Sequence, residues 1–426
     1  MNGMGNSSAG HERDRSRTTR YRRFIGAAIV GLVAAASAGR SEATPAYGRR
    51  YDVSCQTCHA PLPPRLNNVG ILFRKFGFRM PDADDQGRLI IKSVPAQNIG
   101  EAASLVANVA GRRDKDAEVG ESRATFELGE VELVAGTAIG DRISAQAMFV
   151  PWDDGEMALE NAEVQFNGGS ARHQWVARSG LMQTYAWQKP IHGRLTLSTP
   201  LLFESQAVQG VGPFGGFGLG VSQIGAELGY VFTRLREGHL SSTMMSAALL
   251  NGVDHEGNAA IRNTTEGTDL YVQGLQLFGA RNTLGGFYYR GRSFLDAAPD
   301  EGLLDAGKQR FARYGVIGNY VLLNRFDVVA GGALGWDRSP LQSGDVRFGG
   351  IFTEVDAQLT PSWIGVYRFD RIDPNRDMDG DTARAHTFST TLRADDHLYL
   401  TGEYQRRRLV DGDRPWSLIV SARLAY

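Results

Sequence analysis

Cysteine is almost absent from this chain: 2 of its 426 residues are cysteine, and both lie in one short run. No disulfide can therefore brace distant parts of the fold. Excess charge is also missing, because the net charge is −1, which argues against nucleic acid or another polyanion as a partner. Beyond the N-terminal region, no apolar run is long enough to cross a membrane as a helix.

The two cysteines form the run Cys55-Gln56-Thr57-Cys58-His59, which has the spacing of a c-type haem attachment site. Two intervening residues let both sulfurs reach one porphyrin edge, and the adjacent histidine supplies an axial nitrogen to the iron. We therefore predict one haem c, covalently bound to Cys55 and Cys58, with His59 as its proximal ligand. This chemistry indicates a protein that handles electrons.

A redox dithiol, a structural disulfide and half of a zinc site are the alternatives for a C-x-x-C run. A zinc site needs two further Cys or His ligands nearby, whereas the next histidine after His59 is His173. A thioredoxin-like dithiol lies in a βαβ context, which the sequence does not have. The haem interpretation is favoured over all three.

The N-terminus has the pattern of an export signal. An apolar run from Phe24 to Gly39 contains the cleavage signal Ala36-Ser37-Ala38, and arginines precede the run. The run is shorter than the roughly 20 residues of a spanning helix, which disfavours a membrane anchor. We predict a signal peptide over 1–43 and a mature protein in or beyond the periplasm.

The remainder of the chain, 97–426, repeats segments of alternating polar and apolar residues separated by turn signals. The strands are expected near 100–112, 122–138, 142–150, 157–167, 172–182, 219–234, 239–250, 267–280, 282–294, 309–322, 325–337, 346–358, 362–372, 383–394, 397–409 and 415–426. Every short turn then falls at one end and every long connection at the other. An even strand number with this asymmetry is typical of bacterial outer-membrane barrels.

The predicted fold class is therefore all-β: a 16-stranded antiparallel outer-membrane β-barrel, preceded by a small α-helical monohaem cytochrome c domain. A soluble β-sandwich or propeller is the alternative, but no blade-length repeat is present. We expect the longest connection, 183–218, to fold inward. Aromatic groups at 287–289 and at Tyr367 and Phe369 are expected to form an interfacial girdle.

The small domain is expected over 44–96, with a helix from Arg65 to Phe78. Its apolar residues recur at near-helical spacing. About fifty residues cannot build much of a core alone, so this face is expected to pack on the porphyrin.

The sequence offers several candidates for the sixth ligand of the iron. Met80 is the only Met or His between His59 and residue 100, and His/Met ligation raises the reduction potential. Met80 could instead only fill apolar space. The other candidate ligands come from the barrel region: Met148, Met182, His173 and His192.

The residues around the haem motif resemble those of a known family. The matching positions are Ala43 to Tyr51, Ser54, Pro64-Arg65-Leu66-Asn67, Gly70 and Phe73-Arg74. This pattern is similar to the N-terminal signature of the fused outer-membrane cytochrome–porins of iron-oxidising bacteria. The resemblance implies oxidation of extracellular Fe(II) at the haem, hence a possible Fe(II) oxidase activity, and electron delivery to a soluble periplasmic cytochrome or other acceptor.

Three functions follow from these expectations. The first is an electron conduit in the Gram-negative outer membrane, in contact with lipid, with the haem domain in the barrel lumen or on the periplasmic side. The donor is Fe(II) or another extracellular reductant, and no nucleic acid is involved. The second is a solute porin with a structural or regulatory haem plug. The third is a haem-linked sensor or peroxidase, which needs a vacant sixth position.

Overall fold

The structure is a computed structural model. It describes residues 46–115, 122–153, 156–183, 193–203, 222–236, 239–252, 268–295, 307–338, 345–380, 382–409 and 412–426. The predicted signal peptide, 1–43, lies outside the described residues. Within the described ranges, no helix is long and apolar enough to cross a membrane.

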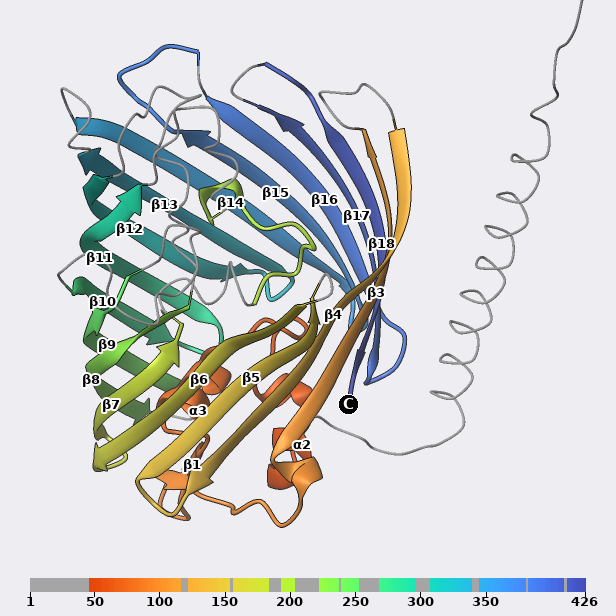
Figure 1. Ribbon diagram of the computed structural model, residues 1–426. Helices are drawn as coiled ribbons and strands as arrows, with labels where there is room; N and C mark the ends of the chain where they lie inside the picture. The colour runs from red at the N-terminus through yellow and green to blue at the C-terminus, as the bar shows by residue number, and fades with distance from the viewer. Residues whose placement is uncertain are drawn as a thin grey trace, which may run out of the picture. The chain divides into compact units, whose positions relative to one another are not determined.

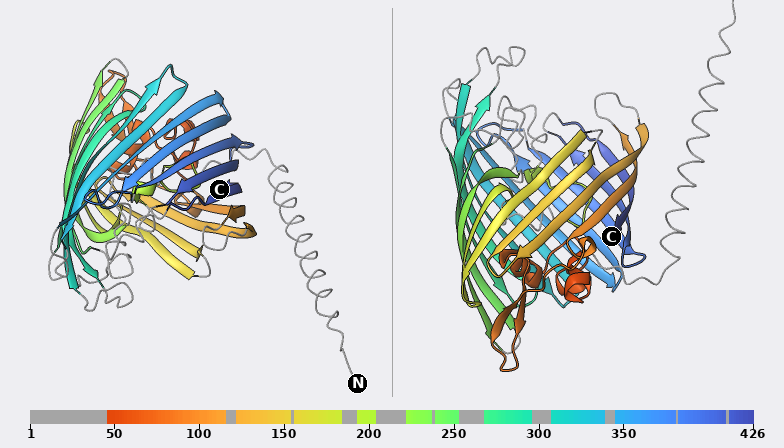
Figure 2. Two further views of the ribbon diagram at one scale, coloured as in Figure 1. Left: turned by 90° about the horizontal axis from the view of Figure 1, so that it is seen from above. Right: turned by 60° about the horizontal axis from the view of Figure 1, so that its bottom comes forward.

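Sixteen antiparallel strands close into one barrel, in which the last strand, β18, pairs with the first barrel strand, β3 (Figures 1 and 2). The strands are β3 (Ala103–Lys115), β4 (Ser122–Ile139), β5 (Ile143–Asp153), β6 (Glu156–Gly169), β7 (His173–Met182), β8 (Gln223–Arg236), β9 (His239–Leu250), β10 (Asp269–Phe278), β11 (Asn282–Leu295), β12 (Gly307–Leu322), β13 (Phe326–Arg338), β14 (Asp345–Thr360), β15 (Trp363–Asp373), β16 (Ala383–Arg393), β17 (Leu398–Arg408) and β18 (Trp416–Ala425). The predicted strand number, order and approximate bounds are confirmed.

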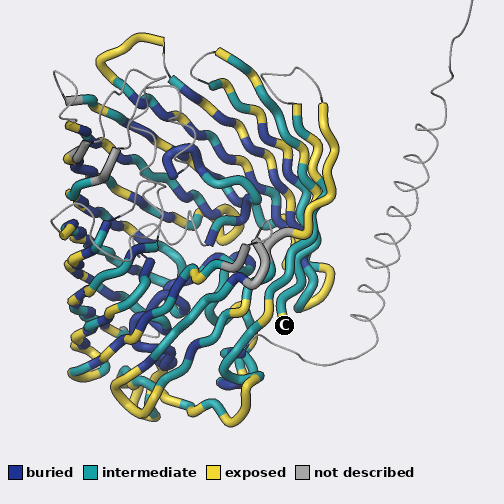
Figure 3. The backbone as a smooth tube through the Cα atoms, in the orientation of Figure 1, coloured by how far each residue is buried: buried dark blue, intermediate teal, exposed yellow. Residues whose placement is uncertain are grey.

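Buried and exposed residues alternate along the strands of the barrel wall, as the banded tube in Figure 3 shows. In β16, Thr387 is buried, whereas its neighbours His386 and Phe388 are exposed. Large apolar side chains such as Leu228 and Val420 are about 60% exposed on the outer face. An apolar outside around a polar inside is the arrangement of a barrel whose outer surface faces lipid.

The two ends of the barrel differ in the length of their connections. At one end, which we call the short-turn end, only a few residues separate consecutive strands, as between β10 and β11. Gly140 and Gly279 lie in such turns with φ of 63° and 64°, a conformation that glycine adopts without steric cost. The opposite end carries the longer connections, except between β5 and β6, where only residues 154–155 separate the strands. The predicted asymmetry is confirmed apart from this one connection.

Residues 46–101, here called the N-terminal segment, precede the barrel. They form α2 (Ala46–Tyr51), η1 (Cys55–Thr57), α3 (Asn68–Lys75), β1 (Met80–Ala83), β2 (Leu89–Lys92) and η2 (Ile99–Glu101). β1 and β2 pair as a small antiparallel sheet. The expected small α-helical domain thus also contains a two-stranded sheet, because the chain turns back after Met80.

The helix expected from Arg65 to Phe78 is shorter than predicted. It begins after Asn67, whose side chain caps it by accepting a hydrogen bond from the backbone N–H of Gly70. It ends before Gly77 and Phe78, both of which have positive φ. A left-handed residue pair cannot continue a right-handed helix.

The longest connection does enter the barrel. Its described part, residues 193–203, is here called the inner loop, and its short helix η3 (Leu201–Phe203) is buried. Phe203 packs in one cluster with Phe287 and Tyr289 of β11, which are also buried. The expectation that residues 287–289 belong to an outer girdle is thus wrong for two of the three; only Tyr288 is exposed. Tyr367 lies on the outer face, as predicted.

Candidate functional site

All four predicted site residues, Cys55, Cys58, His59 and Met80, line one cavity of about 250 Å³, which is partly open to solvent. Most of the wall is apolar and comes from the N-terminal segment. The remaining wall is supplied by the barrel strands β4 and β5 and by the inner loop, through Val134, Gln146 and Gly193.

The Cys55–His59 loop is closed by its own backbone. The N–H groups of Cys58 and His59 both donate to the carbonyl of Cys55, at 3.2 and 2.9 Å. Asn67 adds a third hydrogen bond, which its backbone N–H donates to the Cys58 carbonyl at 2.8 Å. Its side-chain amide donates to the carbonyls of Gln56 and Thr57. The start of α3 is thereby fixed against the cysteine loop.

Gly70 allows this close approach. A Cβ atom at Gly70 would lie 2.4 Å from the carbonyl oxygen of Cys58, closer than real Cβ contacts. Only glycine lets α3 pack directly on the loop, and Gly70 lines the cavity together with Cys55 and Cys58. In the sequence, Gly70 stands out only as part of a family pattern.

The imidazole of His59 is oriented by the backbone. Its Nδ1 lies 3.3 Å from the carbonyl oxygen of Pro64, so Nδ1 carries the proton and Nε2 is free to bind a metal. Burial lowers the pKa of His59 to about 4. The ring is therefore neutral at neutral pH, as an axial ligand must be.

The two thiols are free and do not form a disulfide with each other. Burial raises the pKa of Cys58 to about 12 and also raises the pKa of Cys55. A redox-active dithiol requires a lowered thiol pKa, so these shifts count against that alternative. Among the described residues, no group of three or more His, Cys, Asp or Glu side chains could hold a metal ion, which leaves a zinc site without its further ligands.

Met80 is the candidate sixth ligand that reaches the cavity. Its side chain is 8% exposed and packs with Phe73 and Phe78. The His173 alternative is wrong, because this side chain is exposed on the outer face of β7 and its Nδ1 lies 2.5 Å from the Tyr230 hydroxyl.

The other methionine alternatives do not line the cavity. Met182 packs with Leu202 and Phe203 in a different cluster, and Met148 is absent from the cavity lining. His192 lies outside the described residues.

Tyr47, Phe73 and Phe78 form the cavity wall beside Met80, and Tyr51 packs behind them. The ring of Tyr47 stacks on Phe78 with centroids 5.3 Å apart and meets Phe73 edge-on at 5.0 Å. The hydroxyl of Tyr51 donates to the Phe78 carbonyl at 2.7 Å. Both tyrosines lie in α2, a helix too short to produce a periodic sequence signal.

The N-terminal segment is bound to the inner face of the barrel by buried polar contacts. Lys75 Nζ lies 3.0 Å from Glu227 Oε1 of β8, and Arg65 forms ion pairs with Glu354 and Asp356 of β14. At the short-turn end, Arg79 donates to the carbonyls of the β4–β5 turn region, Gly140 and Ile143, at 2.8 and 2.9 Å.

Asn68 makes a further contact with the short-turn end. Its backbone N–H donates to the Ala280 carbonyl at 2.9 Å, and its side-chain amide donates to the carbonyls of Gly279 and Asn282 at 2.9 and 3.0 Å. Together these contacts pair a basic segment with an acidic inner wall. The segment lies against lumen-facing side chains near the short-turn end.

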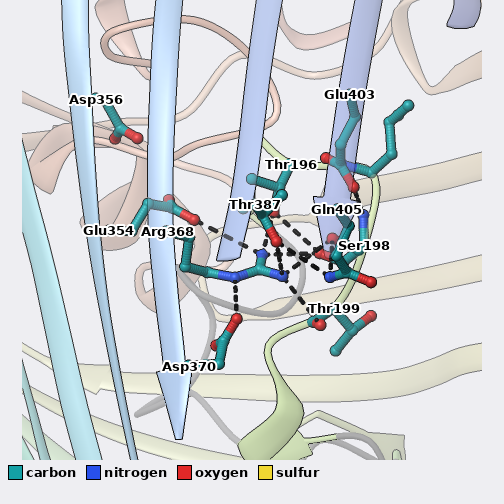
Figure 4. A network of polar contacts seen from close by, with 12 residues as sticks. Thr196, Ser198, Thr199, Glu354, Asp356, Arg368, Asp370, Thr387, Glu403 and Gln405 are labelled. Atoms are coloured by element: carbon teal, nitrogen blue, oxygen red, sulfur yellow. Dashed lines mark hydrogen bonds and ion pairs between the residues drawn. The ribbon is translucent and has the colours of Figure 1, made fainter. Parts of the chain in front are cut away.

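The inner loop is held by a second polar network on the wall, drawn in Figure 4. The guanidinium of Arg368 binds Asp370 at 2.9 Å and donates to the Ser198 carbonyl at 2.8 Å. Glu403 accepts the backbone N–H groups of Leu197 and Ser198 at 2.6 and 2.9 Å. These contacts keep the inner loop across the lumen beside Gly193, which borders the cavity.

No known family model matches the chain, and no curated protein matches its sequence. Among solved structures, it is similar to the anion-selective porin from Comamonas acidovorans, with a TM-score of 0.54 and 11% identity over 76% of this chain and 98% of that one. OprB of Pseudomonas putida matches with a TM-score of 0.49 and 10% identity, over 76% of this chain and 93% of that one. The chain has the fold of outer-membrane porins, and at this identity the likeness shows the fold alone.

Proposed function

We propose that this chain is an outer-membrane electron-transfer protein that passes electrons from an extracellular donor, with Fe(II) as the favoured substrate, to a periplasmic acceptor through one covalent c-type haem. The observation that carries the proposal is the single cavity lined by Cys55, Cys58, His59 and Met80. When bound, the haem supplies a one-electron couple at its iron. The apolar outer surface of the barrel supports the assignment to a membrane.

The residues present fit a haem c. Cys55 and Cys58 would hold the porphyrin through thioethers, formed by adding each S–H across a vinyl double bond. His59 would present Nε2 to one face of the iron, while the Pro64 carbonyl keeps the proton on Nδ1. Met80 would offer its sulfur as a further ligand to the iron. The stacked aromatics beside Met80 would exclude water from the ring.

The position of the cavity suits transfer across a membrane. The apolar band of an outer membrane is roughly 25 Å tall, so a group at the short-turn end cannot touch an extracellular reductant directly. In outer-membrane barrels short turns are periplasmic. We propose that the donor enters the lumen from the long-connection end, and that the acceptor docks at the short-turn end near Cys55.

The solute porin is the second candidate, because the fold is that of porins. Against it, the N-terminal segment contacts the barrel through Arg65, Asn68, Lys75 and Arg79, which supports a segment that obstructs the lumen. A conduit of this kind should conduct few ions in planar bilayers. Porin-like conductance by the intact protein would favour the solute porin.

The experiment starts from the protein purified from outer membranes of a host that matures c-type cytochromes. A denaturing gel stained for haem tests attachment, with a Cys55→Ala/Cys58→Ala variant as the matched control. Adding Fe(II) to the oxidised protein should produce the absorption spectrum of ferrous haem. A haem that stays oxidised under excess Fe(II) would exclude this donor, and a chain without haem stain would exclude the electron-transfer function.

Carbon monoxide distinguishes the sensor or peroxidase alternative. An iron with Met80 bound should show a ferrous spectrum that carbon monoxide hardly changes. An immediate shift of the whole spectrum would indicate a vacant sixth position and would favour ligand sensing or peroxidase chemistry.

A further inference from the structure

One buried arginine, Arg65, joins the loop that follows His59 to the wall of the barrel. Its side chain is 0% exposed and forms ion pairs with Glu354 and Asp356, which face the lumen from β14. Its Nε donates to the carbonyl of Gly193 in the inner loop at 3.1 Å. Three parts of the chain that are distant in sequence therefore meet at one guanidinium group.

The backbone of Arg65 belongs to the same small loop as the His59 ring. The N–H of Ala60 donates to the Arg65 carbonyl, and the N–H of Arg65 donates to the Leu62 carbonyl, both at 3.1 Å. An isolated bridge pairs His59 with Leu66. Because Pro64 immediately precedes Arg65, a shift of Arg65 moves the carbonyl that orients the His59 imidazole.

The wall carboxylates that hold Arg65 are themselves fixed. Glu354 lies 3.9 Å from Arg368, the residue that holds the inner loop in Figure 4. Arg368 also binds Asp370, and both side chains are fully buried. The loop after His59 is thus attached to a network that is anchored on both β14 and β15.

We propose that Arg65, held by Glu354 and Asp356, is a positioning residue for the axial ligand His59. In this arrangement, the barrel wall fixes the position of the Pro64 carbonyl. That carbonyl in turn fixes the orientation of the imidazole plane. The inference rests on the proposed haem site and assigns a role to β14 that the N-terminal segment cannot perform alone. Arg65 suits the role because its planar fork binds two carboxylates at once, which a lysine ammonium on a flexible stem does not reproduce.

The test compares two disruptions of the same pair. The first is Arg65→Gln, and the second is the double variant Glu354→Gln/Asp356→Asn. Each is read by electron paramagnetic resonance of the oxidised haem, which reports the orientation of the axial imidazole, and by redox titration. Lys75→Met is the matched control, because it removes another buried cation that ties the N-terminal segment to the wall but lies in α3, away from the loop 59–66.

Positioning predicts that both disruptions change the resonance spectrum in the same way, with broadened or displaced signals, while Lys75→Met leaves the spectrum as it is. A charge effect alone predicts unchanged signals and opposite changes in reduction potential. Arg65→Gln would then lower the potential and the double variant would raise it, by about 59 mV for each tenfold change in the one-electron equilibrium. That result, or no change at all, would overturn the inference.

A triple variant, Arg65→Met/Glu354→Gln/Asp356→Asn, serves as the control for misfolding, because it leaves no unpaired buried charge. Positioning predicts that it folds into a heat-modifiable barrel with bound haem and gives the altered spectrum. A wild-type spectrum in this variant would contradict the proposal. Failure of the proposed function can be distinguished from failure of this inference, because the wild-type protein would then carry no haem stain.

Discussion

Lys75 Nζ lies 3.0 Å from Glu227 Oε1, and Arg178 binds the other oxygen of the same carboxylate at 3.0 Å. Two cations, one from the N-terminal segment and one from the wall, thus share one anion in the lumen. Burial lowers the pKa of Lys75 to about 8, although the Glu227 charge opposes the shift. Docking of the segment should consequently depend on pH.

The direction of this pH dependence follows from which state of the segment, docked or undocked, binds more protons. Between pH 8 and 10.5, the docked Lys75 has lost its proton, whereas a lysine exposed by undocking still binds one. The undocked state then binds more protons, so the free energy of undocking rises with pH across this window, by at most roughly 3 kcal/mol. Native-state proteolysis of the N-terminal segment, corrected for protease activity on an unfolded substrate, measures this change.

The control for this prediction is a second lysine. Lys75→Met should abolish the rise, whereas Lys92→Met, at an exposed position in β2, should retain it. A rise that survives in Lys75→Met would assign the pH dependence to another group.

Gly70→Ala tests the contact between α3 and the cysteine loop. The added Cβ would lie 2.4 Å from the Cys58 carbonyl oxygen, so α3 must move away, at a cost of about 1–3 kcal/mol for overpacking. We expect lower haem content per chain, measured as the ratio of haem absorbance to protein. Gly402→Ala, where the nearest atom would be 3.9 Å away, should keep the wild-type ratio. Equal ratios in both variants would contradict this packing.

The strands could be predicted from the sequence because alternation is a local signal that every barrel strand repeats. The same alternation would have corrected the aromatic group at 287–289: since Tyr288 faces outward, its two neighbours must face inward. The end of the helix α3 could also have been anticipated from Gly77, which follows its last turn.

The contacts that dock the N-terminal segment could not be predicted in this way. Arg65 meets Glu354 across 289 sequence positions, and nothing local distinguishes Arg65 from the other arginines, nor Glu354 from the other acids. Among the cavity-lining residues, Cys55, Cys58 and His59 could be predicted from a motif, and Met80 because it is the only Met or His between His59 and residue 100. Tyr47 lies within the family pattern 43–51, but only the packed structure brings its side chain to the cavity.

Met80→Leu tests the sixth ligand with little change in volume. If the Met80 sulfur binds the iron, the variant should lose that ligand, its reduction potential should fall, and its ferrous form should bind carbon monoxide at once. Spectra with and without carbon monoxide measure the effect. Met182→Leu is the control, since Met182 is also buried but lies in another cluster. A potential unchanged by Met80→Leu would assign Met80 to packing.

Asn68→Ala tests how firmly the N-terminal segment is held at the short-turn end. The side-chain amide donates to carbonyls of the β10–β11 turn region, including Gly279 and Asn282, and Asn68 is 0% exposed. Removing the amide leaves buried carbonyls unsatisfied, which costs about 1–3 kcal/mol. We expect a roughly 5- to 150-fold increase in native-state proteolysis of the segment, because 1.4 kcal/mol corresponds to a factor of ten in an equilibrium. Asn98→Ala, whose exposed side chain bonds only to Glu101 within the same segment, should cleave at the wild-type rate. Equal rates in all three proteins would mean that the turn contact does not hold the segment in place.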